Sequence, residues 1–282
     1  MTDITVVTTF HKPGLDLYGQ RFLDSFAERV DKRIKLLVYA EDCNPIINPM
    51  CENIKVLNAK EVLPKLNAFK ERWKNVPHAN GDISKHPARN GRRDWNKEFK
   101  WDAVRFANKV YAVFDACERS EDWCVWMDAD TFVHSDWTYD QFKLLLPETS
   151  WITYVGRGKG SQTWPECGFY GLNLKDNVCQ RFLAEFERMY EDADNGMFKL
   201  VEWHDSFIFG HIVNNMKRRA PNVLDYSAEM YLKEAKSGGG GHPLINTVLG
   251  KWIDHMKGDR KVTGKSKASD IMVNRTESYW AK

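Results

Sequence analysis

Two acidic residues at the end of one apolar segment are the strongest candidates for chemistry. Asp128 and Asp130 follow the run WCVWM at 123–127, which predicts a buried strand. Two carboxylates two residues apart, where a strand gives way to a loop, can reach one hard cation and leave coordination sites open. Mg²⁺ and Mn²⁺ take oxygen ligands, commonly one or two carboxylates together with substrate phosphates. The pattern predicts a divalent metal site; the alternative is a strand-end turn with two solvated carboxylates.

A second cluster lies near the carboxyl end of the chain, in HMKGDRK at 255–261. The imidazole of His255 can bind Mn²⁺, and Gly258 lets the backbone approach a phosphate closely. Arg260 and Lys261 can neutralise pyrophosphate oxygens. Alone, such a basic stretch is more often solvated surface, so its meaning comes from combination with the two aspartates.

Two shorter segments place acidic, imidazole or small side chains where an element begins, and binding groups often project there. They are Pro165 to Phe169, which contains Glu166, and Trp203 to Ser206, which contains His204 and Asp205. Asp205 precedes an apolar helix, so a helix N-cap is the alternative for it. His204 fits a partly buried aromatic ring equally well.

The elements that must position these residues alternate between strands and helices. A β-branched run at 4–10 is followed by a turn, a helix pattern at 22–30, and strands at 35–40 and 54–57. This alternation predicts a parallel, doubly wound sheet. Ligands bind such sheets at the carboxyl ends of the strands, so the loop after Phe10 is expected to contact a nucleotide.

The rest of the chain continues the pattern. A helix is expected from about Phe99 to Cys117, with a polar stripe of Asp102, Arg105 and Lys109. Further strands are expected at 150–155 and 168–174, and further helices at 176–190 and 205–217. The polar loop at 78–98 and the glycines at 238–241 are expected to order over a bound donor and exclude water.

Composition excludes several classes of protein. The chain has 282 residues, 43% of them hydrophobic and 28% charged, which rules out a disordered or fibrous protein. A net charge of +2 gives no reason to expect nucleic acid as a partner. No apolar run approaches the ~18 residues of a transmembrane segment. Without a signal peptide, the six cysteines are expected to be reduced and the protein cytoplasmic.

The segment Cys124 to Val133 closely resembles the Asp-x-Asp segment of glycogenin-like and bacterial sugar-transferring enzymes of the retaining, GT-A-fold glycosyltransferase family. His255, Gly258 and Lys261 match that family's His-x-x-Gly-x-x-Lys motif. Between them, Glu166 to Gly168 stands where the family has Asn-x-Gly, and Asp205-Ser206 where it has Asp-Gln. Lys109 stands upstream, where the family carries a lysine that contacts the donor.

The resemblance implies an α/β fold of the GT-A, Rossmann-like kind, with a mostly parallel central sheet flanked by helices. It implies a glycosyltransferase domain at 1–262, followed by a basic C-terminal tail at 263–282. Asp128, Asp130 and His255 would coordinate Mn²⁺, or Mg²⁺, which bridges the diphosphate of a nucleotide sugar, expected to be UDP-linked. The residues expected to contact the donor are Thr8, Thr9, Phe10, Tyr18, Asp102, Lys109, Asp128, Gly258 and Lys261.

The activity implied is transfer of a sugar to an acceptor hydroxyl, on a carbohydrate or glycoconjugate, with retention of configuration. A divalent cation and a lysine would stabilise the growing negative charge of the departing diphosphate. The candidate catalytic residues are Asp205, Glu166 and Lys109. Because Glu166 replaces Asn and Ser206 replaces Gln, a carboxylate acting as base or nucleophile stays open.

Two other functions compete with glycosyl transfer. A sugar- or nucleotide-binding protein with the same fold and no turnover is one, since fold alone does not decide function. A haloacid-dehalogenase-like phosphatase is the other, because its strand also ends in Asp-x-Asp-x-Thr. Here Thr131 comes one position early, Phe132 takes the Thr place, and the motif lies mid-chain rather than on the first strand.

Overall fold

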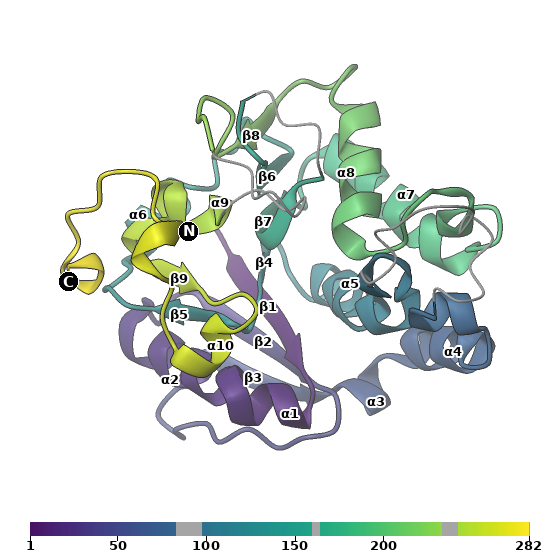
Figure 1. Ribbon diagram of the computed structural model, residues 1–282, viewed down its shortest axis with the longest axis horizontal. Coiled ribbons are helices and arrows are strands. Elements are labelled where there is room, and N and C mark those ends of the chain that lie inside the picture. The colour runs from purple at the N-terminus through teal and green to yellow at the C-terminus, as the bar shows by residue number, and fades with distance from the viewer. Residues whose placement is uncertain (83–97, 160–163, 233–241, 282) are drawn as a thin grey trace.

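The computed structural model describes residues 1–82, 98–159, 164–232 and 242–281. Their strands form a seven-stranded sheet in the order β3-β2-β1-β4-β7-β6-β8 and a small sheet of β5 and β9 (Figure 1). The strands are β1 Ile4–Phe10, β2 Lys35–Ala40, β3 Ile54–Asn58, β4 Trp123–Met127, β5 Thr131–Val133, β6 Ile152–Val155, β7 Glu166–Asn173, β8 Val223–Asp225 and β9 Ile253–His255. The mixed α/β class, with a central sheet flanked by helices, is as predicted.

The helices are α1 Lys12–Gly14, α2 Gln20–Arg29, α3 Ala59–Val62, α4 Pro64–Trp73, α5 Ala103–Glu118, α6 Tyr139–Lys143, α7 Asn177–Glu191, α8 Asp205–Met216, α9 Pro243–Asn246 and α10 Arg260–Thr263. A π-helical stretch at Leu15–Gly19 joins α1 to α2. Within the described part of the chain, no helix is long and apolar enough to cross a membrane. All six cysteines are free.

The sheet is mostly parallel, with one reversal. Strands β3, β2, β1 and β4 run parallel, and β8 runs parallel to β6. Strand β7 is antiparallel to both β4 and β6, so the sheet is mostly parallel, as predicted. Because the segment between Val155 and Glu166 is shorter than the dozen or more residues that a parallel crossover requires, β6 and β7 pair as antiparallel neighbours.

Each face of the sheet packs on its own apolar core, and β4 contributes to both because side chains alternate along a strand. Cys124 and Trp126 pack with residues of α4, α5, α7 and α8, whereas Trp123, Val125 and Met127 pack with α2, α6 and α9. Figure 1 shows these two sets of helices on opposite sides of the sheet. Burial of β4 on both faces fixes the point at which Asp128 emerges.

Helix α5 begins later than its apolar pattern predicted. Residues Glu98–Trp101 form a 3₁₀ turn, and α5 runs from Ala103 to Glu118. The carboxylate of Asp102 accepts a hydrogen bond from the backbone N–H of Arg105 at 3.2 Å, which makes Asp102 the N-cap. Most of the loop at 78–98, and all of the glycines at 238–241, lie outside the described residues.

Candidate functional site

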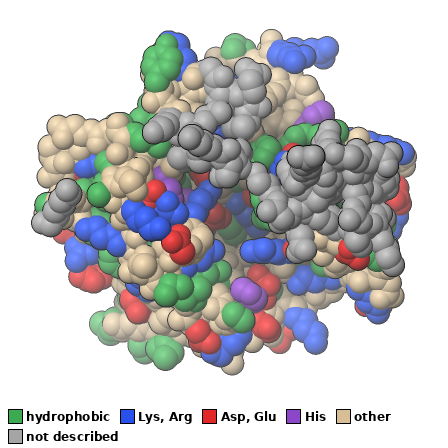
Figure 2. Space-filling model, in the orientation of Figure 1, with side chains coloured by type: hydrophobic (Ala, Val, Ile, Leu, Met, Phe, Trp, Pro, Cys, Tyr) green, Lys and Arg blue, Asp and Glu red, His purple; other side chains and the backbone are tan. Residues whose placement is uncertain are grey.

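A cleft of about 590 Å³ opens at the carboxyl ends of β1, β2 and β4. Most of the predicted donor-contacting residues line it: Thr9, Phe10, Tyr18, Asp102, Lys109, Asp128 and Lys261. Thr8 and Gly258 are not among the described residues of its wall. Figure 2 shows acidic and basic side chains gathered around a hollow near the centre of this face. Most of the residues predicted to contact the donor thus share one cleft at this edge of the sheet.

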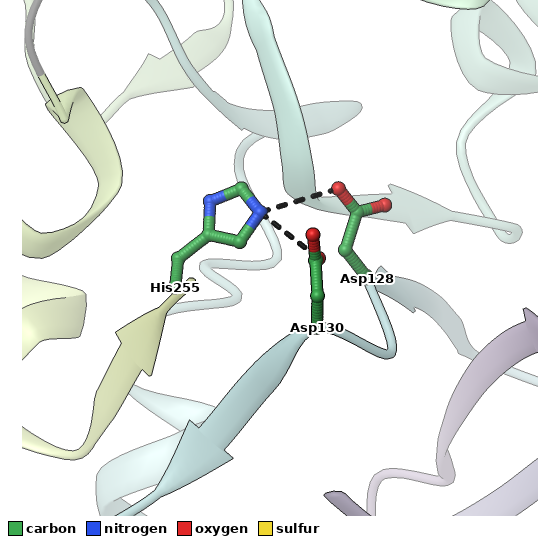
Figure 3. Close-up of side chains that lie close together, drawn as sticks. All are labelled: Asp128, Asp130 and His255. Carbon is green, nitrogen blue, oxygen red and sulfur yellow. Dashed lines mark ion pairs between the residues drawn. The ribbon is translucent and has the colours of Figure 1, made fainter. Parts of the chain in front are cut away.

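Asp128 and Asp130 line this cleft, and the buried imidazole of His255 meets both carboxylates (Figure 3). The Nε2 atom of His255 lies 3.2 Å from Oδ1 of Asp130 and 3.4 Å from Oδ2 of Asp128. One ligand atom from each residue falls within 4.8 Å of the others. Asp130 and His255 are 125 positions apart in sequence. They are brought together because β5, which directly follows Asp130, pairs with β9 and places Thr131 opposite His255.

The donor set and its surroundings fit a divalent cation. Nε2 of His255 is buried and has no hydrogen-bond partner among the described residues, although it faces two carboxylates. Burial disfavours the charged imidazole, but Asp130 and Asp128 outweigh burial and raise the pKa of His255 to about 9. Two carboxylate oxygens and an imidazole nitrogen suit Mn²⁺, Mg²⁺ or a similar ion. These residues can therefore hold a metal once His255 loses its proton.

Lys109 joins this cluster to the start of α8. Its Nζ lies 3.2 Å from Oδ1 of Asp128 and 2.8 Å from Oδ2 of Asp205, and it also donates to the carbonyl oxygen of Cys167. Burial disfavours the ammonium, but the two carboxylates outweigh it and raise the pKa of Lys109. The lysine is therefore charged, and it reaches the cleft wall from α5.

Lys261 pairs with the other aspartate of the cluster, Asp130. Its Nζ lies 2.9 Å from Oδ2 of Asp130 and 4.7 Å from the ring centroid of Tyr18. The preceding loop turns at Gly258, whose φ of +60° favours glycine, and a β-carbon there would meet no atom within 4 Å. The turn leaves open space at Gly258, where an anion can approach the backbone.

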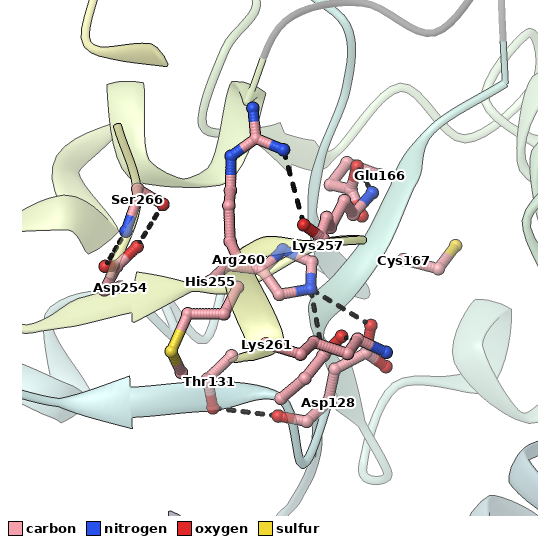
Figure 4. Close-up of polar contacts among 12 residues, drawn as sticks. Asp128, Thr131, Glu166, Cys167, Asp254, His255, Lys257, Arg260, Lys261 and Ser266 are labelled. Atoms are coloured by element: carbon pink, nitrogen blue, oxygen red, sulfur yellow. Dashed lines mark hydrogen bonds and ion pairs between the residues drawn. The ribbon is translucent and has the colours of Figure 1, made fainter. Parts of the chain in front are cut away.

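Glu166 is neutralised by two cations. It ion-pairs with Lys257 (Figure 4), and its Oε2 is 3.4 Å from Nη2 of Arg157. Burial raises its pKa, but these cations outweigh burial and hold the pKa of Glu166 at about 2. Glu166 is thus an ionised, buried carboxylate whose charge is compensated, and it is absent from the described lining of the cleft.

Asp205 occupies the first turn of α8, one residue after the N-cap position, which is held by His204. Only 4% of Asp205 is exposed, and its carboxylate pairs with Lys109. His204 is also buried; its Nε2 is 3.0 Å from Glu202, and its ring packs against Phe99 and Trp164. The alternative of Asp205 as an N-cap is therefore wrong, and His204 is a packed aromatic ring.

Several residues of the cleft wall were not predicted to contact the donor. They are His11, Glu41, Lys70, Val104, Arg105, Phe106, Asn108, Trp126 and Ala129, whereas Asp130 was predicted as a metal ligand. Glu41 follows β2, and its Oε1 accepts a hydrogen bond from Oγ1 of Thr9 at 3.2 Å. A rule that searches the residue after every parallel strand would have found Glu41, as it found Asp128.

Comparison with known proteins gives a likeness of shape alone. No protein-family model and no curated protein matches the sequence. The apo structure of the bifunctional glycosyltransferase WbbM matches 79% of this chain with a TM-score of 0.44 and 14% identity, and this chain spans 38% of WbbM. The apo structure of mouse xyloside xylosyltransferase 1 matches 79% of this chain and 85% of its own length, with a TM-score of 0.42 and 9% identity.

Both of these solved structures are glycosyltransferases. At TM-scores below 0.5 and identities of 14% and 9%, they assign neither a family nor a reaction to this chain.

Proposed function

We propose that this protein is a metal-dependent glycosyltransferase that moves a sugar from a nucleoside diphosphate to an acceptor hydroxyl. The observation that carries the proposal is the meeting of His255 with Asp128 and Asp130, two aspartates that line a cleft and that each pair with a lysine. Such oxygen and imidazole ligands, with cations nearby, suit a diphosphate bound to a divalent cation.

In this proposal Asp128, Asp130 and His255 hold Mn²⁺ or Mg²⁺, which as a Lewis acid would stabilise the leaving diphosphate. Lys261 exchanges its ion pair with Asp130 for a diphosphate oxygen, and the open turn at Gly258 admits that phosphate. Lys109 contacts the phosphate or the sugar of the donor, and the ion pair with Asp205 holds the lysine in place. These residues orient the donor and neutralise charge.

The nucleoside occupies the part of the cleft near the ends of β1 and β2. Thr9, Phe10 and Tyr18 line that part, and the ring of Tyr18 provides a surface on which a base can stack. We propose a UDP-linked donor because the Asp-x-Asp and His-x-x-Gly-x-x-Lys segments resemble those of enzymes that use such donors. The acceptor is a carbohydrate or glycoconjugate.

We propose that the reaction retains the anomeric configuration. An inverting transfer needs a base that takes the acceptor's proton. Glu166 and Asp205, the two acids expected near the sugar, are each paired with a cation and absent from the described cleft wall. With these carboxylates engaged, an oxygen of the departing phosphate would accept the proton on the face from which it leaves.

Turnover of a set of nucleotide sugars tests this proposal. The full-length protein is incubated with UDP-, GDP-, ADP- and CDP-hexoses and Mn²⁺, with and without chelator, and proton NMR follows the anomeric signals. We expect metal-dependent release of one nucleoside diphosphate, together with free or transferred sugar. Binding without turnover in the presence of a broad set of acceptors would favour a non-catalytic binding protein. Release of inorganic phosphate would favour the phosphatase.

A further inference from the structure

We propose that Asp254 and Asp270 are positioning residues, through which the C-terminal segment, residues 264–281, sets His255 and Lys261 at the metal and diphosphate site. The inference rests on the proposed function and extends it to residues outside the cleft. Asp254 is next in sequence to His255, which would bind the metal. Asp270 pairs with Arg260, which is next in sequence to Lys261, the residue that would contact the diphosphate.

Asp254 fixes the strand that carries His255. It is fully buried, and its carboxylate accepts hydrogen bonds from Ser266 N at 2.8 Å, Ser266 Oγ at 2.5 Å and Tyr279 Oη at 2.8 Å. In Figure 4 Asp254 is bonded to Ser266 on one side, whereas His255 points toward Asp128. A buried carboxylate must keep its donors, so the segment and β9 hold one another.

Asp270 fixes the loop that carries Lys261. Its carboxylate receives two hydrogen bonds from the guanidinium of Arg260, with Nε to Oδ2 at 2.6 Å. It also accepts the backbone N–H of Lys267 at 2.7 Å. Because a two-pronged arginine–carboxylate pair restricts direction as well as distance, it orients the loop from which Lys261 reaches Asp130.

The segment is itself anchored, so it can act as a support. Arg275 donates to the carbonyl oxygens of Ile245 and Thr247, just before β9. The buried indole of Trp280 donates to the carbonyl oxygen of Gly250 at 2.7 Å. These anchors hold the segment to residues 245–250, which lead into β9. The segment therefore connects the residues before β9 with the loop after β9 that carries Lys261.

The two contacts act on different parts of the site. Asp254 acts on His255, a predicted metal ligand, and Asp270 acts on Lys261, a predicted diphosphate contact. Weakening the first contact is expected to affect metal binding, and weakening the second is expected to affect diphosphate binding. A merely structural segment would lower stability and leave both affinities unchanged.

The test uses two mild variants of the full-length chain, Asp270→Asn and Tyr279→Phe. Each has a matched control away from the cleft. Asp31→Asn removes a comparable carboxylate, which pairs with Arg33 and accepts a backbone N–H from Tyr139. Tyr139→Phe removes a comparable tyrosine hydrogen bond, from its hydroxyl to the carbonyl oxygen of Thr2 at 2.7 Å. Calorimetry measures binding of Mn²⁺ alone, of UDP with Mn²⁺, and of uridine.

We expect Asp270→Asn to weaken UDP binding about tenfold, the loss of one charge-assisted contact to the diphosphate, and to leave uridine binding unchanged. We expect Tyr279→Phe to weaken Mn²⁺ binding about tenfold, as outer-shell changes at metal sites typically do, and both controls to bind as the wild type does. Affinities equal to those of the controls would overturn the inference, and if Asp270→Asn fails to fold, Tyr279→Phe decides it. A wild-type protein that binds no nucleoside diphosphate with Mn²⁺ would instead overturn the proposed function.

Discussion

The imidazole of His255 lies against the backbone of Gly168, so closely that a β-carbon at position 168 would stand 2.6 Å from its Cε1 atom. Real β-carbons do not come this close to a ring, so the ring or the strand has to move if any other residue stands there. The backbone carbonyl of Gly168 also accepts a hydrogen bond from the N–H of Asp128 at 2.9 Å. Gly168 therefore contacts both His255 and Asp128, and its lack of a side chain lets these two residues of the metal cluster meet.

Gly168→Ala is expected to displace His255 and weaken Mn²⁺ binding by about ten- to a hundredfold. Gly171→Ala, on the same strand, is the control, because its β-carbon would meet the flexible end of Leu146 at 2.7 Å instead of a site residue. Calorimetric titration with Mn²⁺ measures both variants. Equal affinities for the two would show that the contact between Gly168 and His255 does not shape the metal site.

Lys261→Met is expected to change two affinities in opposite directions. Removing the ammonium that pairs with Asp130 frees that carboxylate, so Mn²⁺ alone binds as well as before or better. UDP with Mn²⁺ binds about ten- to a hundredfold more weakly, since a hydrogen bond to a charged group contributes about 1.5–3 kcal/mol. Lys70→Met, which alters another cleft lysine, shows whether any lysine has this effect. Loss of both affinities in Lys261→Met would contradict the division of roles.

Lys109→Met is expected to destabilise the protein, because it leaves Asp128 and Asp205 facing each other without the cation between them. Breaking a buried ion pair by removing one partner costs about 3–5 kcal/mol. The double variant Lys109→Met/Asp205→Asn should recover part of this loss. Lys65→Met, which breaks an exposed pair with Glu187, should cost about 0–1 kcal/mol. Urea unfolding in the presence of chelator measures all of them, and similar values for Lys109→Met and Lys65→Met would be the contrary result.

Metal binding is expected to depend on pH through His255. Its pKa is raised to about 9 in the metal-free protein, so at pH 7 Mn²⁺ must displace a proton. The apparent affinity should therefore rise about tenfold per pH unit below pH 9 and level off above it. Titrations in buffers of different ionisation enthalpy count the proton released. His134, whose pKa is lowered to about 4 by burial, provides a control: His134→Asn should leave proton release unchanged.

The same shift predicts how stability varies with pH. A folded-state pKa above the unfolded value of about 6.5 means that the folded protein binds the proton more tightly. The stabilisation is fully present below pH 6.5 and is lost as the pH rises to about 9. Urea unfolding of the metal-free protein should show this loss over that interval, and His255→Asn should remove it. A wild-type curve that matches the variant's would exclude a raised pKa at His255.

The core of the candidate site could be predicted from the sequence because its residues follow the strands of the sheet. An all-apolar strand that ends in Asp128 fixes where the carboxylates emerge. Thr9 and Phe10, which follow from the end of the first strand, line the same cleft, and the resemblance pointed to His255 and Lys261 beside it. Positions set by strand ends are readable, because parallel strands bring their carboxyl ends together.

The rest depended on contacts between distant segments. The reversal of β7 leaves no trace in its apolar pattern, since burial on both faces is independent of direction. The pairing of Glu166 with Lys257 and Arg157, and that of Asp254 with Tyr279, depends on how loops pack across the sheet. Ion pairs of this kind have no fixed spacing in sequence, so only a structure shows which charges are compensated.

The central claim is that Asp128, Asp130 and His255 hold a cation that binds a nucleoside diphosphate. The most direct measurement is calorimetric titration of the wild type and of Asp130→Asn with UDP, GDP, ADP and CDP, each with Mn²⁺ and with chelator. Asp136→Asn, which changes an exposed aspartate paired only at the surface with Arg29, is the control. We predict that the wild type and the control bind one of the four, UDP, only with Mn²⁺, and that Asp130→Asn does not bind it. Binding that is unaffected by chelator, or equal in Asp130→Asn and the wild type, would contradict the claim.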